Sequence, residues 1–357
     1  MIHLNIRRTM QAVCAAAAML SATIALSSCD SVIYDDEGDC SVRYRVGFRY
    51  TKNILNADAF GSQVTGVSLY LFDKAGNLVL HKTAERAVST ENDFYMDVDV
   101  RPGTYDILAW CEGKSVIPDA TSFVIGNGAA PSSIDEVSAS LPLQGTAPDL
   151  YSDRDITRLY HGLSSGVVFP DTYGTVDIAP VMLTKDTNHL SVLLQNVDGK
   201  PLGKDMFKFE IEASNSQMDY RNTIVGNTPF TYMPWSVENT SASFDDSPST
   251  GRDGTVGSTD MPNGVLAELT TGRLMAGREQ YLRISNAATG DVVIRIPLIR
   301  YLLLVRNKYE QADSDQDYLD RYDDFTLMFF IGEGMTWSKT KIYINSWRVV
   351  PPQDEEL

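Results

Sequence analysis

The sequence predicts an all-β protein with two tandem antiparallel β-sandwich domains and one minor helix. Three observations lead to this class. Apolar and polar side chains alternate strictly over 42–50, which is typical of a half-buried strand. Short apolar runs separated by turn residues fill the rest of the first half. After a stretch without periodicity, the same kind of pattern starts again in the second half.

The first predicted domain covers residues 41–165. The turn sequence Asp73-Lys74-Ala75-Gly76-Asn77 joins two of its strands, and Arg101-Pro102-Gly103 joins two others, because these residues favour tight turns. The predicted strands lie at 42–50, 67–72, 78–80, 94–100 and 104–111. Residues 126–148 have little periodicity, and we expect the domain boundary to follow shortly after Gly162.

The second predicted domain covers residues 166–357. Its strands are expected around 190–194, 207–211, 292–296, 325–331 and 342–350. Leu298, Tyr301, Leu302, Val305 and Tyr309 share one face of a helix, so a helix is predicted there. The Ser-, Thr-, Gly- and Asp-rich residues 239–264 are expected to form a long polar loop.

The N-terminal segment predicts export and a lipid anchor. Arg7 and Arg8 precede an uncharged, Ala-rich run that ends in Leu-Ser-Ser-Cys29, which resembles a bacterial lipobox. Residues 1–28 are therefore expected to be a signal peptide, and 29–40 a lipidated acidic tether. The alternative is a transmembrane helix, but the run of about 17 residues is at the short limit for a span. We expect Cys29 to carry acyl chains that hold the mature protein on the outer membrane.

The charge excludes one class of partner. The chain has a formal net charge of −17. Nucleic acids require a basic surface, so no nucleic-acid partner is expected. An acidic chain is suited to a soluble domain outside the cell.

Two cysteines remain after Cys14 leaves with the signal peptide and Cys29 takes the lipid. Cys40 and Cys111 lie in register with apolar strand positions, in a compartment that permits disulfides. We predict a bridge between them, closing a loop of about 72 residues for a stabilisation of roughly 4 kcal/mol. Two buried free thiols are the alternative.

The sequence offers no convincing catalytic or metal-binding set. Outside the signal peptide, His81, His161 and His189 are spaced too irregularly for a metal site or a catalytic pair. The acidic run 313–317, followed by Asp324, imitates a calcium loop, but Tyr318 stands where that loop needs glycine. A solvated loop with a short helical turn is preferred. We therefore predict a protein without enzymatic activity, metal or other cofactor.

Several motifs carry a family resemblance through their joint order. They are Cys-Ser-Val-Arg-Tyr-Arg-Val-Gly-Phe-Arg-Tyr at 40–50, Val-Ser-Leu-Tyr-Leu-Phe-Asp-Lys-Ala-Gly at 67–76, Pro-Gly-Thr-Tyr at 102–105, Ala-Trp-Cys at 109–111, Leu-Tyr-His-Gly at 159–162, Gln-Asp-Tyr-Leu-Asp-Arg at 316–321 and Ile-Tyr-Ile-Asn-Ser-Trp at 342–347. Together they resemble the FimB-type anchor-subunit family of type V fimbriae, over essentially the whole mature chain.

The resemblance implies two transthyretin-like sandwiches and a place at the surface-exposed base of a fimbria. Such a subunit holds the fimbrial shaft to the outer membrane, helps to limit its growth and contacts the neighbouring shaft subunit through a strand. Shaft subunits of this kind lose a first strand to an arginine-specific protease. Arg43, Arg45 and Arg49 lie in the first strand here, and we expect them to stay uncut because strand pairing and the Cys40–Cys111 bridge protect them.

The last strand is the predicted subunit contact. Its contact residues are Ile342, Tyr343, Ile344, Asn345, Trp347 and Val349. Alternation places Tyr343, Asn345, Trp347 and Val349 on one face, and the other face carries Ile342, Ile344, Ser346 and Val350. Bulky apolar residues on both faces suit either the core of its own sandwich or the groove of another subunit. Pro351 and Pro352 cannot donate hydrogen bonds to a sheet, so a donated strand would have to be 342–350 itself.

Two other functions compete with the fimbrial one. A surface glycan-binding lipoprotein without catalytic activity would need exposed aromatic side chains, and Trp235 beside Tyr232 is the candidate. A hydrolase built on a sandwich would need two facing carboxylates in a cleft, which sequence spacing does not reveal.

Overall fold

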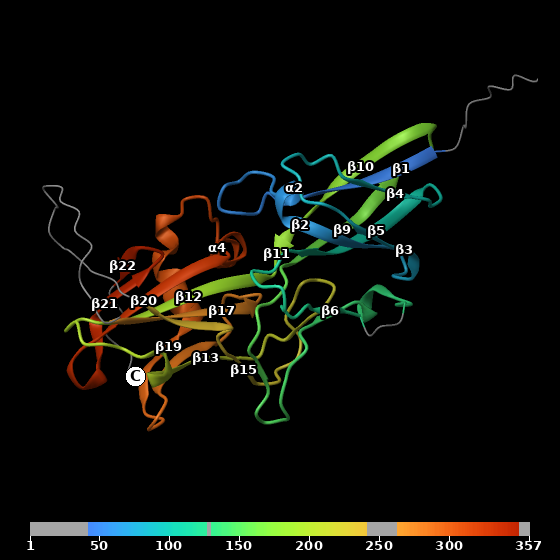
Figure 1. Cartoon of the computed structure of the whole chain (residues 1–357). Coiled ribbons are helices and arrows are strands. Elements are labelled where there is room, and N and C mark those ends of the chain that lie inside the picture. The colour runs from blue at the N-terminus through green and yellow to red at the C-terminus, as the bar shows by residue number, and fades with distance from the viewer. Residues whose placement is uncertain (1–41, 127–129, 241–262, 350–357) are drawn as a thin grey trace, which may run out of the picture. The chain divides into compact units, whose positions relative to one another are not determined.

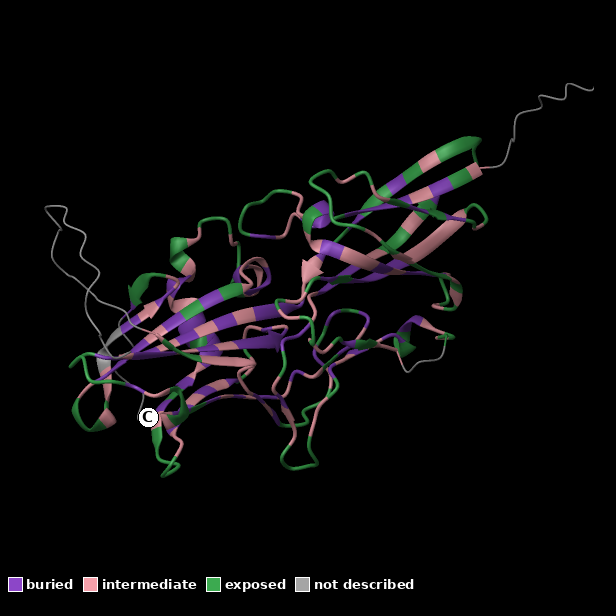
Figure 2. Ribbon diagram, in the orientation of Figure 1, coloured by how far each residue is buried: buried purple, intermediate pink, exposed green. Residues whose placement is uncertain are grey.

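The computed structural model describes residues 42–126, 130–240 and 263–349, and these residues form an all-β fold with short helices (Figure 1). The predicted fold class is confirmed. The strands assemble into two sandwiches, one made mainly from the first half of the chain and one mainly from the second. Buried and exposed residues alternate along many strands, as Figure 2 shows.

The N-terminal sandwich has a three-stranded and a five-stranded sheet. The smaller sheet has the order β10 (Gly174–Met182), β1 (Val42–Arg49), β4 (Tyr95–Val98). The larger has the order β11 (Thr184–Lys185), β9 (Leu159–Phe169), β5 (Gly103–Gly113), β2 (Val64–Phe72), β3 (Leu78–Glu85). A short helix, α2 (Phe60–Gln63), precedes β2.

Aromatic side chains join the two sheets of this sandwich. Tyr44 on β1 packs edge-on against Phe169 at the end of β9, with ring centroids 4.9 Å apart. Tyr50, just after β1, packs in the same way against Tyr160 on β9, at 5.1 Å. All four rings are almost fully buried, so the alternation seen in the sequence of β1 places its apolar face in the core.

The C-terminal sandwich has a six-stranded and a five-stranded sheet. The six-stranded order is β16 (Ser236–Thr240), β17 (Gly264–Gly272), β12 (Thr187–Asn196), β20 (Asp324–Ile331), β21 (Trp337–Ile344), β22 (Trp347–Val349). The five-stranded order is β19 (Val292–Pro297), β18 (Tyr281–Asn286), β13 (Phe207–Ala213), β15 (Phe230–Tyr232), β8 (Tyr151–Ser152). Leu190 and Val192 from the first sheet and Ile211 and Ile284 from the second share one core.

Short elements complete the fold. A small sheet has the order β14 (Gln217–Met218), β7 (Ala139–Ser140), β6 (Val124–Ile125). The helical elements are η1 (Ile134–Glu136), η2 (Lys204–Met206), α3 (Leu298–Leu302), η3 (Leu303–Lys308), α4 (Asp315–Arg321) and η4 (Glu333–Met335). The helix predicted from Leu298 to Tyr309 is confirmed as α3 followed directly by η3.

The chain divides between the sandwiches differently from the prediction. The boundary expected between residues 165 and 166 falls inside β9, which is central in the N-terminal sandwich. Before β9, the chain has already supplied β8 to the C-terminal sandwich, where it pairs with β15. The weak periodicity of 126–148 therefore marks a crossing between sandwiches and not the end of the first domain.

In the part of the chain that the structure describes, two strand pairs are parallel, which the prediction of antiparallel sandwiches did not include. β12 and β20 run parallel over eight residue pairs from His189–Asp324 to Asn196–Ile331. β15 and β8 also run parallel. Apolar alternation sets which face of a strand is buried, but it does not set the direction of the neighbouring strand.

Candidate subunit-contact site

The predicted contact strand is a hairpin and not a single strand. β21 ends at Ile344, and β22 begins at Trp347 and pairs back onto β21. Asn345 and Ser346 have φ values of 50° and 69°, the left-handed conformations that a two-residue hairpin turn requires. Asn tolerates this conformation better than most residues, and this turn signal was missed within an apolar run.

The turn changes which residues share a face. Ile342 pairs with Val349 and Ile344 with Trp347 across the hairpin. Ile342 and Ile344 are completely buried and Val349 is 8% exposed, whereas Trp347 is 44% exposed. The predicted grouping of Tyr343, Asn345, Trp347 and Val349 on one face is therefore wrong, because it assumed an unbroken strand.

Asn345 anchors the turn to the neighbouring strand. Its backbone N–H donates to the Thr326 carbonyl (2.9 Å), and its Oδ1 accepts from the Thr326 N–H (2.9 Å). Thr326 belongs to β20, so the turn continues the pairing of β20 with β21. Asn345 thus has a structural role in this sandwich.

Trp347 is the most exposed large apolar group of the hairpin. The Lys308 ammonium lies 5.0 Å from the centre of its ring, within range of a cation–π interaction. β22 is the last strand of the six-stranded sheet, and in the described residues it pairs only with β21. Its outer backbone edge can therefore accept hydrogen bonds from another strand.

The first strand, in contrast, is paired on both sides. β1 lies between β10 and β4. Arg45 makes two hydrogen bonds to the Asp177 carboxylate (2.7 and 3.0 Å), and its guanidinium lies 4.7 Å from the centre of the Tyr95 ring. Because a paired strand is poorly accessible to a protease, this pairing supports the expectation that the arginines of the first strand stay uncut.

Of the two cysteines predicted to be bridged, only Cys111 lies within the described residues. Cys29 and Cys40 lie outside them. Cys111 is fully buried on β5 and pairs with Tyr160, whose ring contacts Tyr50 just after the end of β1. Burial raises the pKa of the Cys111 thiol above its ordinary value.

Cys111 is a free thiol in the structure. The predicted bridge also requires Cys40, which lies outside the described residues, so the bridge stays a prediction.

The acidic run of the calcium-like motif is helical. Ser314 caps α4 by accepting the Asp317 N–H at 3.1 Å. Asp320 is nearly fully buried and accepts two hydrogen bonds at 2.9 Å from Arg273 and one at 2.8 Å from Lys52. These ion pairs, between residues far apart in the sequence, were not predicted. Within the described part of the chain, no group of three or more His, Cys, Asp or Glu residues is arranged to hold a metal.

The histidines have structural partners. His161 is buried against the Tyr220 carbonyl at 2.8 Å, and burial lowers its pKa to about 4. His189 lies between the carboxylates of Glu268 (2.8 Å) and Asp324 (3.0 Å). Burial alone would lower the pKa of His189, but its hydrogen bonds to these carboxylates raise it to about 9.

The aromatic pair proposed for glycan binding does not form an exposed platform. Tyr232 is completely buried, and its hydroxyl donates to Asn215 and accepts from the Gly272 N–H. The Trp235 indole N–H donates to Thr270 at 3.2 Å. A sugar ring cannot stack on both aromatic faces at this position.

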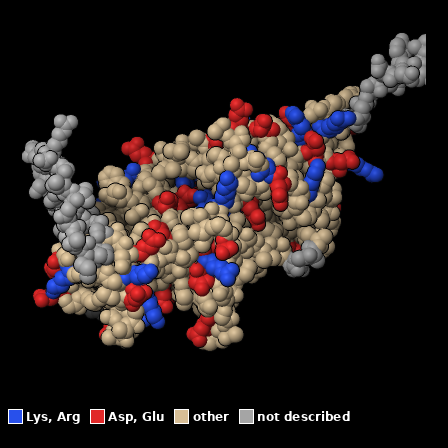
Figure 3. Space-filling view, viewed as in Figure 1, with Lys and Arg blue, Asp and Glu red and all other residues tan. Residues whose placement is uncertain are grey.

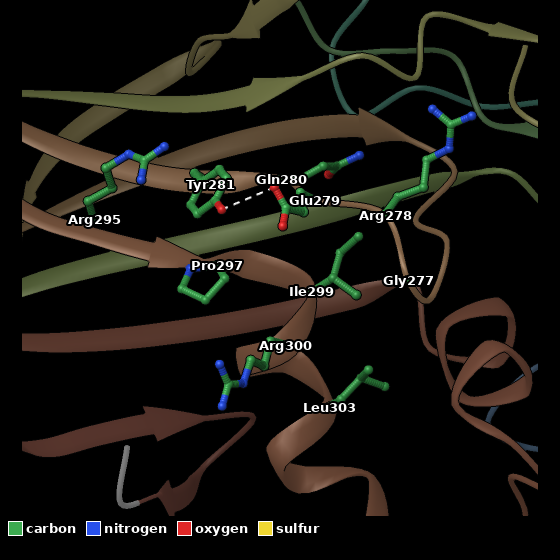
Figure 4. Close-up of a pocket in the computed structure, with 10 residues that line it drawn as sticks. All are labelled: Gly277, Arg278, Glu279, Gln280, Tyr281, Arg295, Pro297, Ile299, Arg300 and Leu303. Carbon is green, nitrogen blue, oxygen red and sulfur yellow. Dashed lines mark hydrogen bonds between the residues drawn. The ribbon is translucent and has the colours of Figure 1, made fainter. Parts of the chain in front are cut away.

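A hollow of about 520 Å³ lies where β18, β19 and α3 meet (Figure 4). Its arginines already have partners within the fold. The Arg295 guanidinium lies 3.8 Å from the centre of the Tyr281 ring and pairs with Glu212 at 2.8 Å. Arg278 donates to the Ile224 carbonyl at 3.0 Å.

On the face of the molecule shown in Figure 3, acidic and basic groups are interspersed.

No helix in the described residues is both long and apolar enough to cross a membrane.

Comparisons with known proteins identify relatives that match most of the chain. The family model of fimbrillin-A associated anchor proteins Mfa1 and Mfa2 matches residues 36–351. A candidate adhesin from Bacteroides thetaiotaomicron is similar in structure, with 27% identity and a TM-score of 0.71 over 88% of this chain and 99% of that one. No curated protein sequence gives a significant match.

Two further solved structures share the fold. A candidate polysaccharide-binding protein from Bacteroides thetaiotaomicron is 25% identical, with a TM-score of 0.70 over 88% of this chain and 99% of that one. The fimbrial anchor protein Mfa2 from Porphyromonas gingivalis is 19% identical, with a TM-score of 0.61 over 87% of this chain and 99% of that one. At this lower identity the likeness shows the fold alone.

Proposed function

This chain belongs to the family of fimbrillin-A associated anchor proteins, and from that premise we propose that it is the lipid-anchored subunit that holds a type V fimbria on the outer membrane. The family match, which covers both sandwiches, carries the proposal. The Leu-Ser-Ser-Cys29 sequence after an uncharged run supports a lipid anchor at Cys29. The acidic residues before the first strand then act as a tether between lipid and sandwich.

The hairpin supplies the contact with the shaft. Among the described residues no second strand pairs with the outer edge of β22, and Trp347 offers an exposed aromatic side chain next to that edge. A strand of the first shaft subunit would pair with this edge, so that main-chain hydrogen bonds give affinity and Trp347 sets the register. The hairpin itself stays in its own sandwich, because Ile342 and Ile344 are buried in its core.

The first strand explains how such a subunit limits growth. A subunit that accepts a strand from a neighbour needs an open position in its sheet. Here β1 fills the position between β10 and β4, and the Arg45–Asp177 ion pair joins it to β10. A chain that keeps β1 would offer no groove there for a neighbour's strand. No further subunit could then be added by strand donation at this position, so growth would end there.

The anchor is tested in cells by changing Cys29→Ala, with Cys111→Ala as the control that keeps the lipid site. We expect Cys29→Ala to leave the detergent phase after phase separation and to release fimbriae into the medium, while Cys111→Ala cells keep both. Detergent partition by Cys29→Ala would contradict the lipid anchor. A lipid-free variant that still retains fimbriae on the cell would contradict the anchoring role.

A further inference from the structure

Two glutamates face each other across a glycine on the outer face of the five-stranded N-terminal sheet. Glu112 on β5 pairs with Gly66 on β2, and Gly66 pairs with Glu85 on β3. Cross-strand partners share one face of a sheet, and neighbouring strands lie about 4.8 Å apart. The two carboxylate side chains therefore flank a gap that Gly66 leaves without a side chain.

No cation within the described residues neutralises these carboxylates. Neither Glu85 nor Glu112 takes part in an ion pair or a side-chain hydrogen bond there. Arg86 lines the same surface, but its guanidinium donates to the carbonyls of Gly61 and Val64 at 2.9 and 2.6 Å. Desolvation, and then the charge of Glu85, raise the pKa of Glu112 above its ordinary value.

The next row of this face holds an unpartnered donor. Trp110 pairs with Ser68, one row from Glu112 and Gly66. The Trp110 side chain is only 1% exposed, and its indole N–H has no hydrogen-bond partner. Trp110, Ser68, Glu85 and Glu112 line one hollow of about 310 Å³. An adjoining hollow of about 480 Å³ shares Gly66 and both glutamates with it.

We propose that this hollow, the Glu85–Glu112 hollow, binds an arginine side chain of a partner polypeptide. The guanidinium donates to both carboxylates. Arginine suits the site because its planar group presents several donors in fixed directions, whereas lysine presents a single charged centre. β3 is the edge strand of its sheet, so the hollow is open to an extended segment alongside it.

A neutral glycan fits the site less well. It would leave the repulsion between the two carboxylates in place, because it brings no positive charge. The Trp110 ring is too deeply buried to offer a stacking surface to a sugar. The inference concerns the N-terminal sandwich and does not depend on the shaft contact proposed for β22.

Isothermal titration calorimetry tests the site, using the full mature chain in detergent and the peptide acetyl-Gly-Arg-Gly-amide. The matched probe is the same peptide with citrulline, which is neutral and of similar shape. We expect the arginine peptide to bind at least tenfold more tightly than the citrulline peptide. The joint change Glu85→Gln with Glu112→Gln should remove this difference, whereas Glu91→Gln, an exposed carboxylate on the same sandwich, should leave it unchanged.

Gly66→Val gives a test that keeps both charges. A Cβ at Gly66 would meet only the Glu112 Cβ, at an ordinary 3.8 Å, so the variant should fold normally. Its side chain fills the gap, and we expect at least a tenfold loss of affinity for the arginine peptide. Equal binding of the arginine and citrulline peptides would overturn the proposal. So would undiminished binding by the folded Gly66→Val variant, or tighter binding of the neutral sugar maltotriose.

Discussion

Asn345 and Thr326 exchange two hydrogen bonds, both of 2.9 Å, which fasten the turn of the C-terminal hairpin to β20. In one bond the Asn345 side chain accepts, and in the other its backbone donates. The same residue has a φ of 50°. One side chain therefore both permits the turn and fixes its position, and the edge strand β22 depends on it.

Replacing Asn345 with Ala should lower the free energy of unfolding by about 1–3 kcal/mol. Alanine removes the acceptor for the Thr326 N–H and is strained in the left-handed conformation. Asn345→Gly relieves the strain but still lacks the acceptor, so its loss should be smaller. Urea unfolding followed by tryptophan fluorescence measures both values. An Asn345→Ala variant as stable as the wild type would show that the turn does not depend on this side chain.

Trp347→Ala should cost little stability, about 1 kcal/mol or less, because the side chain is 44% exposed. Ile344→Ala, at a completely buried position of the same hairpin, should cost about 2–5 kcal/mol. If Trp347 contacts the shaft, its change should nevertheless reduce the amount of shaft that co-purifies with the anchor. Normal co-purification with the Trp347→Ala variant would remove Trp347 from the contact.

Cys111 should behave as a protected free thiol. Burial excludes reagents and raises the pKa of the thiol, so the reactive thiolate is scarce. In the mature chain, a maleimide reagent should label Cys111 only after denaturant is added, without prior reduction. Mass mapping of the peptide that contains Cys111 gives the result. A Cys40–Cys111 peptide pair that appears only under non-reducing conditions would contradict the free thiol and establish the predicted bridge.

His189 should make stability depend on pH between about 6.5 and 9. Its pKa is raised from 6.5 to about 9 in the folded protein, so the protonated ring stabilises the fold fully below pH 6.5. That contribution is lost as the pH rises through 9. His189→Gln should lose less stability than the wild type over this interval, as measured by urea unfolding at pH 6.5 and pH 9.5. Parallel losses in the two proteins would mean that His189 does not carry the effect.

Local patterns in the sequence were enough to predict about half of the strands in the described residues, with their buried faces, but not β9, β10, β17 or β18. Val46 and Phe48 on β1, and Leu190 and Val192 on β12, lie in the core as their spacing requires. The helix from Leu298 was predictable for the same reason. Periodicity records how one element divides its side chains between core and solvent, so it predicts elements well.

The contact site was predicted less well, because its features depend on single residues. The two-residue turn at Asn345 and Ser346 lies in an apolar run and carries no glycine to mark it. Without this turn, Trp347 and Val349 are predicted on the face of Tyr343, whereas in the structure they pair across the hairpin with Ile344 and Ile342.

The sequence by itself determined the all-β class and the family of the chain, because both are written in local order and spacing. Only the tertiary structure decided how the strands are shared between the two sandwiches and which of them run parallel. It also brought Glu85 and Glu112 to the two sides of Gly66, and Arg273 and Lys52 to Asp320. Such neighbours are separated by tens or hundreds of residues, and they meet because sheet register and domain packing bring them together, which no periodicity along the chain encodes.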